Sequence, residues 1–455
     1  MIFRLLISAP FVLALAACTV GPDYQPPVIG LEPTLAEGGS TPIGDVAAQR
    51  WWLAFNDPLL NDLIGTGLEQ NLDIQTSIAR VAEAQAGVRA TGIPAQVAGS
   101  ISANATRSGG SDVSASDAQS VSFAPSVMLD LFGGERRSRE RALAQLQAAQ
   151  LDVGTARLTF VAALVSSYID LRYYQEAMAI TRATIANRTE TLSLVQNQRD
   201  AGTATDLDQA RTQAALDEAI ASLPSLESGF YSSAYAIATL VGQPVQTIED
   251  RLERGSAQPI PPSGSFQVGV PADLLRNRPD IRSAERNYAA AVAAVGVREA
   301  DLYPSLSLGG TVSASEATTW SFGPTLSLPV LNQGVLRANR DQSIAQAQQA
   351  ELAWRGTVLE AVEETQSAQT NVLRNRRAVF ATRGSVQSFE RLVDLSQRTF
   401  EAGTTDLIDL LESQRSLASA NMSLASANRE LAASWASLQI AAGKGWLIRM
   451  DLSDS

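Results

Sequence analysis

The chain has 455 residues, which at roughly 100–200 residues per domain allows two to four ordinary domains. Hydrophobic residues make up 45% and charged residues 18%, which excludes a disordered chain. A formal net charge of -12, with arginines interspersed among acids, excludes a nucleic-acid partner. The chain has no histidine and one cysteine, Cys18, which removes the usual general base and a cysteine-based zinc site. We therefore expect no catalytic residue, no metal and no enzyme activity.

The N-terminus has the pattern of a bacterial lipoprotein signal. Residues 1–17 place Arg4 before an apolar run from Leu5 to Leu15, which is typical of a signal peptide and too short to span a membrane. The run ends in Leu15-Ala16-Ala17-Cys18, so we expect Cys18 to be lipidated and to carry the only non-protein group, a covalent lipid. The alternative is an ordinary signal peptide with a chance cysteine. Thr19 after the cysteine, rather than Asp, indicates an outer-membrane address.

A tether and a first group of helices follow. Residues 18–50 form the lipidated N-terminal tether, because Thr19 to Gly44 is rich in Pro and Gly and has neither a helical nor a strand period. Residues 51–94 are expected to form the first-repeat helices. Their aromatic side chains are expected to pack in a core rather than to bind a ligand: Trp51, Trp52 and Phe55.

Strand-like runs occur in pairs, in residues 95–131 and 304–330, and each pair predicts a barrel β-hairpin. Apolar and small polar residues alternate, as in Leu306 and Leu308 against Ser305 and Ser307, which indicates strands with one apolar and one polar face. A tilted strand needs roughly 9–11 residues to cross a bilayer, about the length of these runs, and a polar face suits a wet lumen. A soluble sandwich with a half-buried sheet is the alternative.

Individual residues in these runs carry further expectations. Pro125 and Pro324 stand at matching positions, and each removes a hydrogen bond from a strand ladder. They predict a shared bend or bulge where strand turns toward helix. Trp320, near a strand start, is a candidate for an interfacial aromatic belt.

Long helical stretches separate the strand pairs. Residues 132–243 and 331–442 each predict a periplasmic helical hairpin, with helices over about 135–199, 206–241, 335–400 and 406–441. Apolar residues recur every seven positions, which predicts left-handed coiled-coil packing; they include Val372, Val379, Val386 and Val393, then Leu410, Leu417, Leu424, Leu431 and Leu438. Each hairpin turns at Ala-Gly-Thr, where glycine allows the positive φ of a helix end.

The two halves carry the same signals in the same order, which indicates an internal duplication. Gly87-Val88-Arg89 recurs as Gly296-Val297-Arg298, and Ala201-Gly202-Thr203 recurs as Ala402-Gly403-Thr404. Residues 244–270 are then an inter-repeat linker, 271–303 the second-repeat helices and 443–455 a C-terminal tail. The fold class is α plus membrane β. Four strands cannot close a barrel and open edges are not tolerated in lipid, so the chain must borrow strands from copies of itself.

Three segments resemble the outer-membrane factor family, the TolC-like and OprM-like efflux ducts, in its lipoprotein NodT branch. They are Cys18-Thr-Val-Gly-Pro-Asp-Tyr24, Trp51-Trp52 with Phe55-Asn56-Asp57-Pro58, and Val270-Pro-Ala-Asp-Leu-Leu-Arg-Asn-Arg-Pro-Asp-Ile281. The resemblance covers nearly the whole chain. It implies a homotrimer with a twelve-stranded barrel and a periplasmic helical tunnel. It also implies a periplasmic adaptor and an inner-membrane transporter, usually of the RND class, as partners.

The same resemblance implies site residues. The family closes its periplasmic end with carboxylate rings, and by position Asp409 and Glu412 fall on them, with Glu412 departing from the family's frequent Asp. Their first-half equivalents are Asp208 and Arg211, and Arg211 is a candidate to hold the closed state by pairing with an acid on a neighbouring helix. The alternative is a solvated helix face.

The hairpin tips, Gly202-Thr203 and Gly403-Thr404, resemble the family's adaptor-docking turns, and ordinary helix-ending turns are the alternative.

The expected function is the exit duct of a tripartite, RND-type efflux pump, lipid-anchored in the outer membrane, for small toxic solutes. A TolC-like duct for type I protein secretion and a soluble periplasmic coiled-coil scaffold are the alternative functions. Small polar lining residues carry little selectivity, so the sequence does not identify the solute.

Overall fold

The structure is a computed structural model that describes residues 19–35, 37, 42–262 and 269–447. The expected signal peptide, residues 1–17, and the expected lipidation site, Cys18, lie outside the described residues. The chain divides into two compact units. Unit 1 takes in the chain up to Gly30, Ser77–Val153 and Asp280–Val358, and unit 2 takes in Leu31–Thr76, Gly154–Pro279 and the chain from Leu359.

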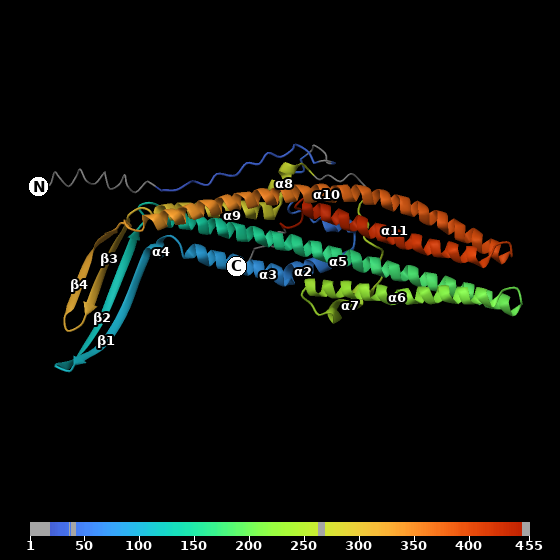
Figure 1. The fold of residues 1–455 in the computed structure, drawn as a ribbon, viewed down its shortest axis with the longest axis horizontal. Coiled ribbons are helices and arrows are strands. Elements are labelled where there is room, and N and C mark those ends of the chain that lie inside the picture. The colour runs from blue at the N-terminus through green and yellow to red at the C-terminus, as the bar shows by residue number, and fades with distance from the viewer. Residues whose placement is uncertain (1–18, 36, 38–41, 263–268, 448–455) are drawn as a thin grey trace. The chain divides into compact units, whose positions relative to one another are not determined.

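Unit 1 contains a four-stranded antiparallel sheet with strand order β1-β2-β3-β4 (Figure 1). The strands are β1 (Val97–Gly110), β2 (Val113–Leu129), β3 (Ser305–Ala314) and β4 (Thr318–Ser327). None of their residues is buried, and every residue of β1 is exposed. In a sandwich, one face of the sheet would be buried against a second layer. Among the described residues, neither face of this sheet is covered, so the sandwich alternative does not describe it.

Both prolines lie inside strands, so the expectation of a bend toward helix is wrong. Pro125 stands opposite Gly99 in the β1–β2 register, and Pro324 stands opposite Leu308 in the β3–β4 register. The β2–β3 ladder has pairs at Phe123 and at Ser126 but none at the two residues between them. The missing amide of Pro125 therefore falls where β2 makes no pairing with β3. Pro324 lies in an outer strand, where proline is tolerated.

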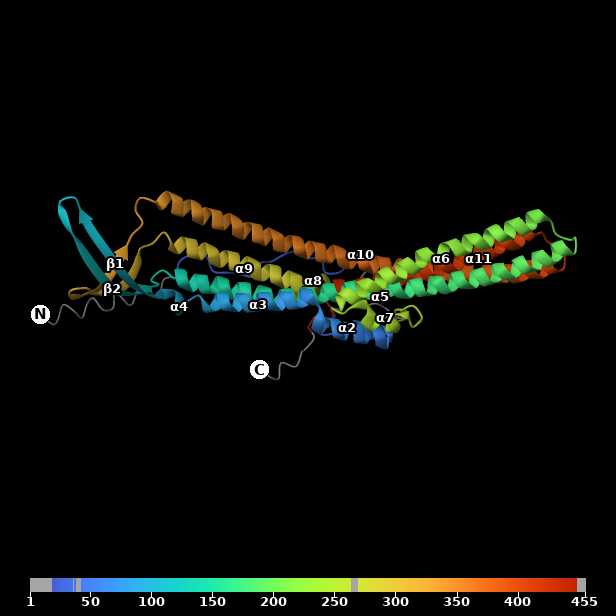
Figure 2. The same ribbon diagram turned by 90° about the horizontal axis from the view of Figure 1, so that it is seen from below.

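Three helices of unit 1 pack side by side, with α9 (Pro279–Ala300) between α5 (Gly134–Asp200) and α10 (Gln333–Glu401), as Figure 2 shows. The α5–α9 contact uses small residues, Ala144 with Ala289 and Ala290, and a hydrogen bond of 2.6 Å from the Ser283 hydroxyl to Asp152. Small side chains let the helices approach closely along this seam. Shorter helices α3 (Leu72–Arg89) and α4 (Ile93–Gln96) lead into β1.

Unit 2 contains two helical hairpins. The carboxyl-terminal part of α5 pairs with α6 (Asp206–Leu240), and that of α10 pairs with α11 (Leu407–Ala441). All four helices begin and end within two residues of the positions expected from the sequence. Most of the predicted heptad positions are buried, among them Val372, Leu410 and Leu438. Three are half-buried: Val393, Leu417 and Leu424. Although α5 is apolar enough to span a membrane by length and composition, its residues Leu164, Val165 and Tyr168 belong to the core.

The main core of unit 2 collects the aromatic residues near the start of the chain. Trp51, Trp52 and Phe55 of η1 (Trp51–Phe55) are buried, and the Phe55 ring meets Trp435 of α11 edge to face, 4.9 Å between centroids. The expectation that they pack rather than bind a ligand is confirmed. Helix α2 (Pro58–Gln70) follows. The inter-repeat linker contains a helix that the sequence analysis did not predict, α7 (Val245–Glu253), before α8 (Pro271–Asn277).

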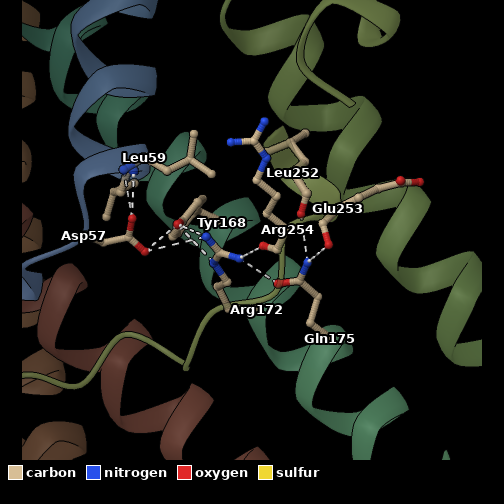
Figure 3. A network of polar contacts seen from close by, with 9 residues as sticks. Asp57, Leu59, Tyr168, Arg172, Gln175, Leu252, Glu253 and Arg254 are labelled. Carbon is tan, nitrogen blue, oxygen red and sulfur yellow. Dashed lines mark hydrogen bonds and ion pairs between the residues drawn. The ribbon is translucent and has the colours of Figure 1, made fainter. Parts of the chain in front are cut away.

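A buried polar network joins three segments of unit 2 (Figure 3). Asp57 caps α2 by accepting from the amides of Leu59 and Leu60, and it also accepts from the hydroxyl of Tyr168 on α5. Arg172, one turn further along α5, donates to the Tyr168 hydroxyl at 2.6 Å and to the carbonyl of Arg254 at 2.8 Å. The start of α2 and the segment after α7 are thereby both hydrogen-bonded to α5.

Candidate functional site

The two hairpin tips are near-identical turns, as their matching sequences predict. Gly202 and Gly403 have φ of 77° and 71°, in the left-handed region that favours glycine. Each following threonine donates its amide and its hydroxyl to one carbonyl of the preceding helix. Thr203 donates to Gln198 at 2.8 and 2.9 Å, and Thr404 donates to Thr399 at 2.9 and 3.0 Å. The repeated Gly-Thr therefore ends the helix and fixes the shape of both tips.

The tips lie against each other in unit 2. A small hydrophobic cluster of Val195, Phe400, Leu407 and Leu410 joins them. Beside the cluster is a cavity of about 630 Å³ whose polar lining comes from both hairpins. The lining includes the predicted site residues Thr203, Gly403, Asp208 and Arg211, together with Gln198, Glu401 and Asp406. The structure therefore brings part of the predicted gate and docking set to one place.

Asp208 is held in the first turn of α6. Its carboxylate accepts from the amide and the hydroxyl of Thr205 at 3.0 and 2.7 Å, which completes a capping box. These hydrogen bonds from Thr205, together with the charge of Arg211, lower the pKa of Asp208. Arg211 lies 4.0 Å from Asp208 on its own helix. Within one chain, its charge is therefore directed to its own helix.

Asp409 and Glu412 lie on a different face and do not line the cavity between the tips. Both are exposed, whereas Leu410 and Ser413 of the same helix are buried. Glu412 lies 2.9 Å from Arg415, and both side chains are more than half exposed. The two carboxylates therefore point away from the core of their own chain, on a face that is free to meet solvent or another copy.

The residues that follow the expected lipidation site occupy a socket in unit 1. The Arg137 side chain is 5% exposed and donates to the carbonyls of Val20 and Gly21 at 3.2 and 3.3 Å, and to Asp23 at 2.7 Å. Gly21 has φ of 86°, and a Cβ there would lie 2.5 Å from the Cα of Gly296. The motif that ends at Tyr24 therefore includes a glycine and an acid that fit this socket. Nothing in the sequence pointed to Arg137.

Residues 270–279, which belong to the segment that contains Arg-Pro-Asp, form a junction in unit 2. Asp273 accepts from the amide of Ile43 at 3.0 Å. Asn277, fully buried, donates to the carbonyl of Gly44 at 2.7 Å, and its own carbonyl accepts from the Trp446 indole at 2.7 Å. The characteristic segment therefore joins the tether to the end of the described chain and plays a structural part.

Three comparisons place these features among known proteins. A family model described as outer membrane efflux protein matches residues 63–243 and 270–444. Nodulation protein T of Rhizobium leguminosarum bv. trifolii is 39% identical over 451 residues, covering 96% of each chain. The pyoverdine export outer membrane protein OpmQ of Pseudomonas aeruginosa is 30% identical, covering 88% of each chain. The solved outer-membrane channel OprN has a TM-score of 0.85 and 30% identity, covering 94% of this chain and all of that one.

Proposed function

Because the chain belongs to the outer membrane efflux protein family, and is an efflux channel of the outer membrane, we propose that it works as a lipid-anchored homotrimer. In this proposal it is the exit duct of a tripartite pump. A periplasmic adaptor connects it to an inner-membrane transporter of the RND class, which supplies the energy. The family membership excludes the soluble scaffold alternative.

The observation that supports assembly with copies of the same chain is the four-stranded sheet. β1 and β4 are its outer strands, and each pairs with one neighbour within the described chain. Unpaired backbone groups on a strand edge are costly in lipid, and both faces of this sheet are uncovered. Pairing β4 of one copy with β1 of the next satisfies both edges at once. Three copies, the number that the family resemblance implies, would give twelve strands, an even number within the range of outer-membrane barrels.

The lipid anchor is supported by the socket beside it. Thr19 follows the proposed lipidation site directly, and the amide of Val20 donates to the carbonyl of Phe132 at 3.1 Å, three residues after β2 ends. A lipid on Cys18 would then be attached next to a segment held close to the end of a membrane strand. Mass spectrometry of the N-terminal peptide tests this proposal: Cys18 should carry acyl chains, and Cys18→Ser should lack them and accumulate unprocessed precursor.

The proposed gate is the face of α11 that carries Asp409 and Glu412. Threefold symmetry would bring six carboxylates near one axis, where like charges attract cations and repel one another. The pairing of Glu412 with Arg415 reduces the net charge of that second ring. Asp409→Asn should therefore change single-channel conductance more than Glu412→Gln. Arg211→Ala should raise the closed-state conductance if Arg211 pairs with an acid of a neighbouring copy, and should leave it unchanged otherwise.

The proposed docking surface is the pair of tips. Thr203 and Thr404 occupy the same position in matched turns, so an adaptor with a repeated binding motif would meet equivalent surfaces. A photo-crosslinking amino acid at either tip should capture the adaptor in cells. The same group at Thr189, an exposed residue within α5, is the control and should capture less.

Deletion of the gene tests the efflux function itself. Loss of the protein should increase susceptibility to at least one toxic compound or metal in a broad panel, and the full-length chain should restore resistance. Cys18→Ser should restore it only in part, because the anchor contributes to location rather than to the pore. Unchanged susceptibility across the panel would count against efflux.

A further inference from the structure

A groove on unit 1 that the proposed function does not use is lined by cationic and amide side chains. It encloses about 390 Å³ over three adjacent helices. Its polar lining is Arg141 and Gln145 of α5, Asn287 and Arg298 of α9, and Ser343 and Gln346 of α10. The lining includes two guanidinium groups and no carboxylate. Such a set of donors favours an anion over a cation.

The charge in the groove is only partly neutralised. Arg298 lies 3.2 Å from Asp301, which directly follows the end of α9 and is outside the lining. Arg141 is exposed, and no carboxylate within the described residues forms an ion pair with it. Between the polar side chains lie the small apolar residues Ala290, Ala291 and Ala294. The groove therefore offers donors at its rim and an apolar floor, a combination that suits an organic anion.

The groove and the tether lie on opposite sides of α9. The tether side is marked by Gly296, whose backbone packs against Gly21, and by Glu285, which accepts from the Tyr24 hydroxyl at 2.7 Å. An α-helix turns by roughly 100° per residue. Asn287 and Arg298 are nine and two residues from Gly296, so both project about half a turn away from the tether.

We propose that this groove is an anion-binding subsite on the inner wall of the duct. The inference rests on the proposed function, because a tether that ends in a lipid must run along the outside of the tube. The opposite side of α9 then faces the lumen. In a trimer, three grooves bring six guanidinium groups to the wall. Rings of Arg or Lys are what anion-conducting pores use, and a charged wall raises the local concentration of solutes of opposite sign.

The ligand class is an organic anion that carries several phosphate, sulfate or carboxylate groups, and the probe is myo-inositol hexakisphosphate. It is added on the barrel side of a planar bilayer that contains the purified mature trimer, and the ionic current is measured. We expect block that weakens as KCl concentration rises, because salt screens the attraction. Arg141→Gln combined with Arg298→Gln should raise the half-blocking concentration by about tenfold, the loss of charge-assisted contacts on each copy.

Arg136→Gln is the matched control, since it removes the same charge from α5 on the tether side, where Arg136 lies 3.4 Å from the Thr19 hydroxyl. Its half-blocking concentration should equal that of the wild type. If the double variant does not assemble, Arg141→Gln alone, on an exposed side chain, carries the test. Wild-type current that the probe does not block, or equal loss of block in the control, overturns the subsite. A trimer that carries no current would contradict the proposed channel function, and the subsite proposal, which rests on that function, would then be wrong as well.

Discussion

Replacing Arg172 by methionine should loosen unit 2 at two places that are far apart in sequence. The Arg172 side chain is 3% exposed and lies 3.8 Å from Asp57. Its loss leaves the Asp57 carboxylate, 12% exposed, without its ion-pair partner, and leaves the carbonyl of Arg254 without this donor. Removing one partner of a buried ion pair costs about 3–5 kcal/mol. The start of α2 and the segment after α7 should open more readily by that amount.

Hydrogen exchange measured by mass spectrometry on the purified protein detects this local opening. At about 1.4 kcal/mol per factor of ten, exchange of peptides from α2 and α7 should accelerate by roughly a hundredfold to four thousandfold. Arg182→Met is the control, because Arg182 is on the same helix but is 62% exposed and 4.0 Å from its partner Glu227. A surface pair contributes about 0–1 kcal/mol, so exchange should change little. Acceleration in Arg172→Met no larger than in the control would refute the reasoning.

Three further predictions concern the tether, the chain's one lysine and the first tip. Gly21→Ala should expose the tether to protease because its Cβ has no room, whereas Gly30→Ala, with nothing within 4 Å, should not. Lys444 is the only lysine, is 8% exposed, and burial lowers its pKa. The native protein should therefore gain no amine label there, and the guanidinium-unfolded protein should gain one. Hydrogen bonds from Thr205 lower the pKa of Asp208. The ionised carboxylate therefore stabilises the folded tip at pH values above the unfolded pKa of 3.8, and this stabilisation is lost as the pH falls through the lower pKa of the folded state. Amide hydrogen exchange of the tip peptide, measured relative to a mid-helix peptide, should therefore rise below about pH 4. Asp208→Asn should remove that pH dependence.

The helices and the duplication were predictable because their signals are local and repeated. A seven-residue apolar spacing specifies both the helix and its buried stripe, as Val372 and Val379 show. Glycine at the tips indicates a left-handed backbone conformation that ends the helix, and Gly202 and Gly403 adopt that conformation. Both signals can be recognised from the local sequence, without knowledge of any contact between distant residues.

The polar contacts were not predictable, because they join single residues that are far apart in the chain. Asp23 meets Arg137 over a separation of 114 residues, and the Tyr168 hydroxyl meets Asp57 over 111. Any of the 47 acids is a possible partner for any of the 35 basic residues. The proline prediction failed for a related reason, since whether Pro125 breaks a strand depends on whether a neighbouring strand needs its amide.

The claim that three lipid-anchored copies close one duct is tested most directly by native mass spectrometry of the mature protein extracted from outer membranes. The expected result is one complex with the mass of three chains, each beginning at Cys18 and carrying acyl chains. A monomer or dimer as the principal species, or three chains without added lipid mass, would contradict it.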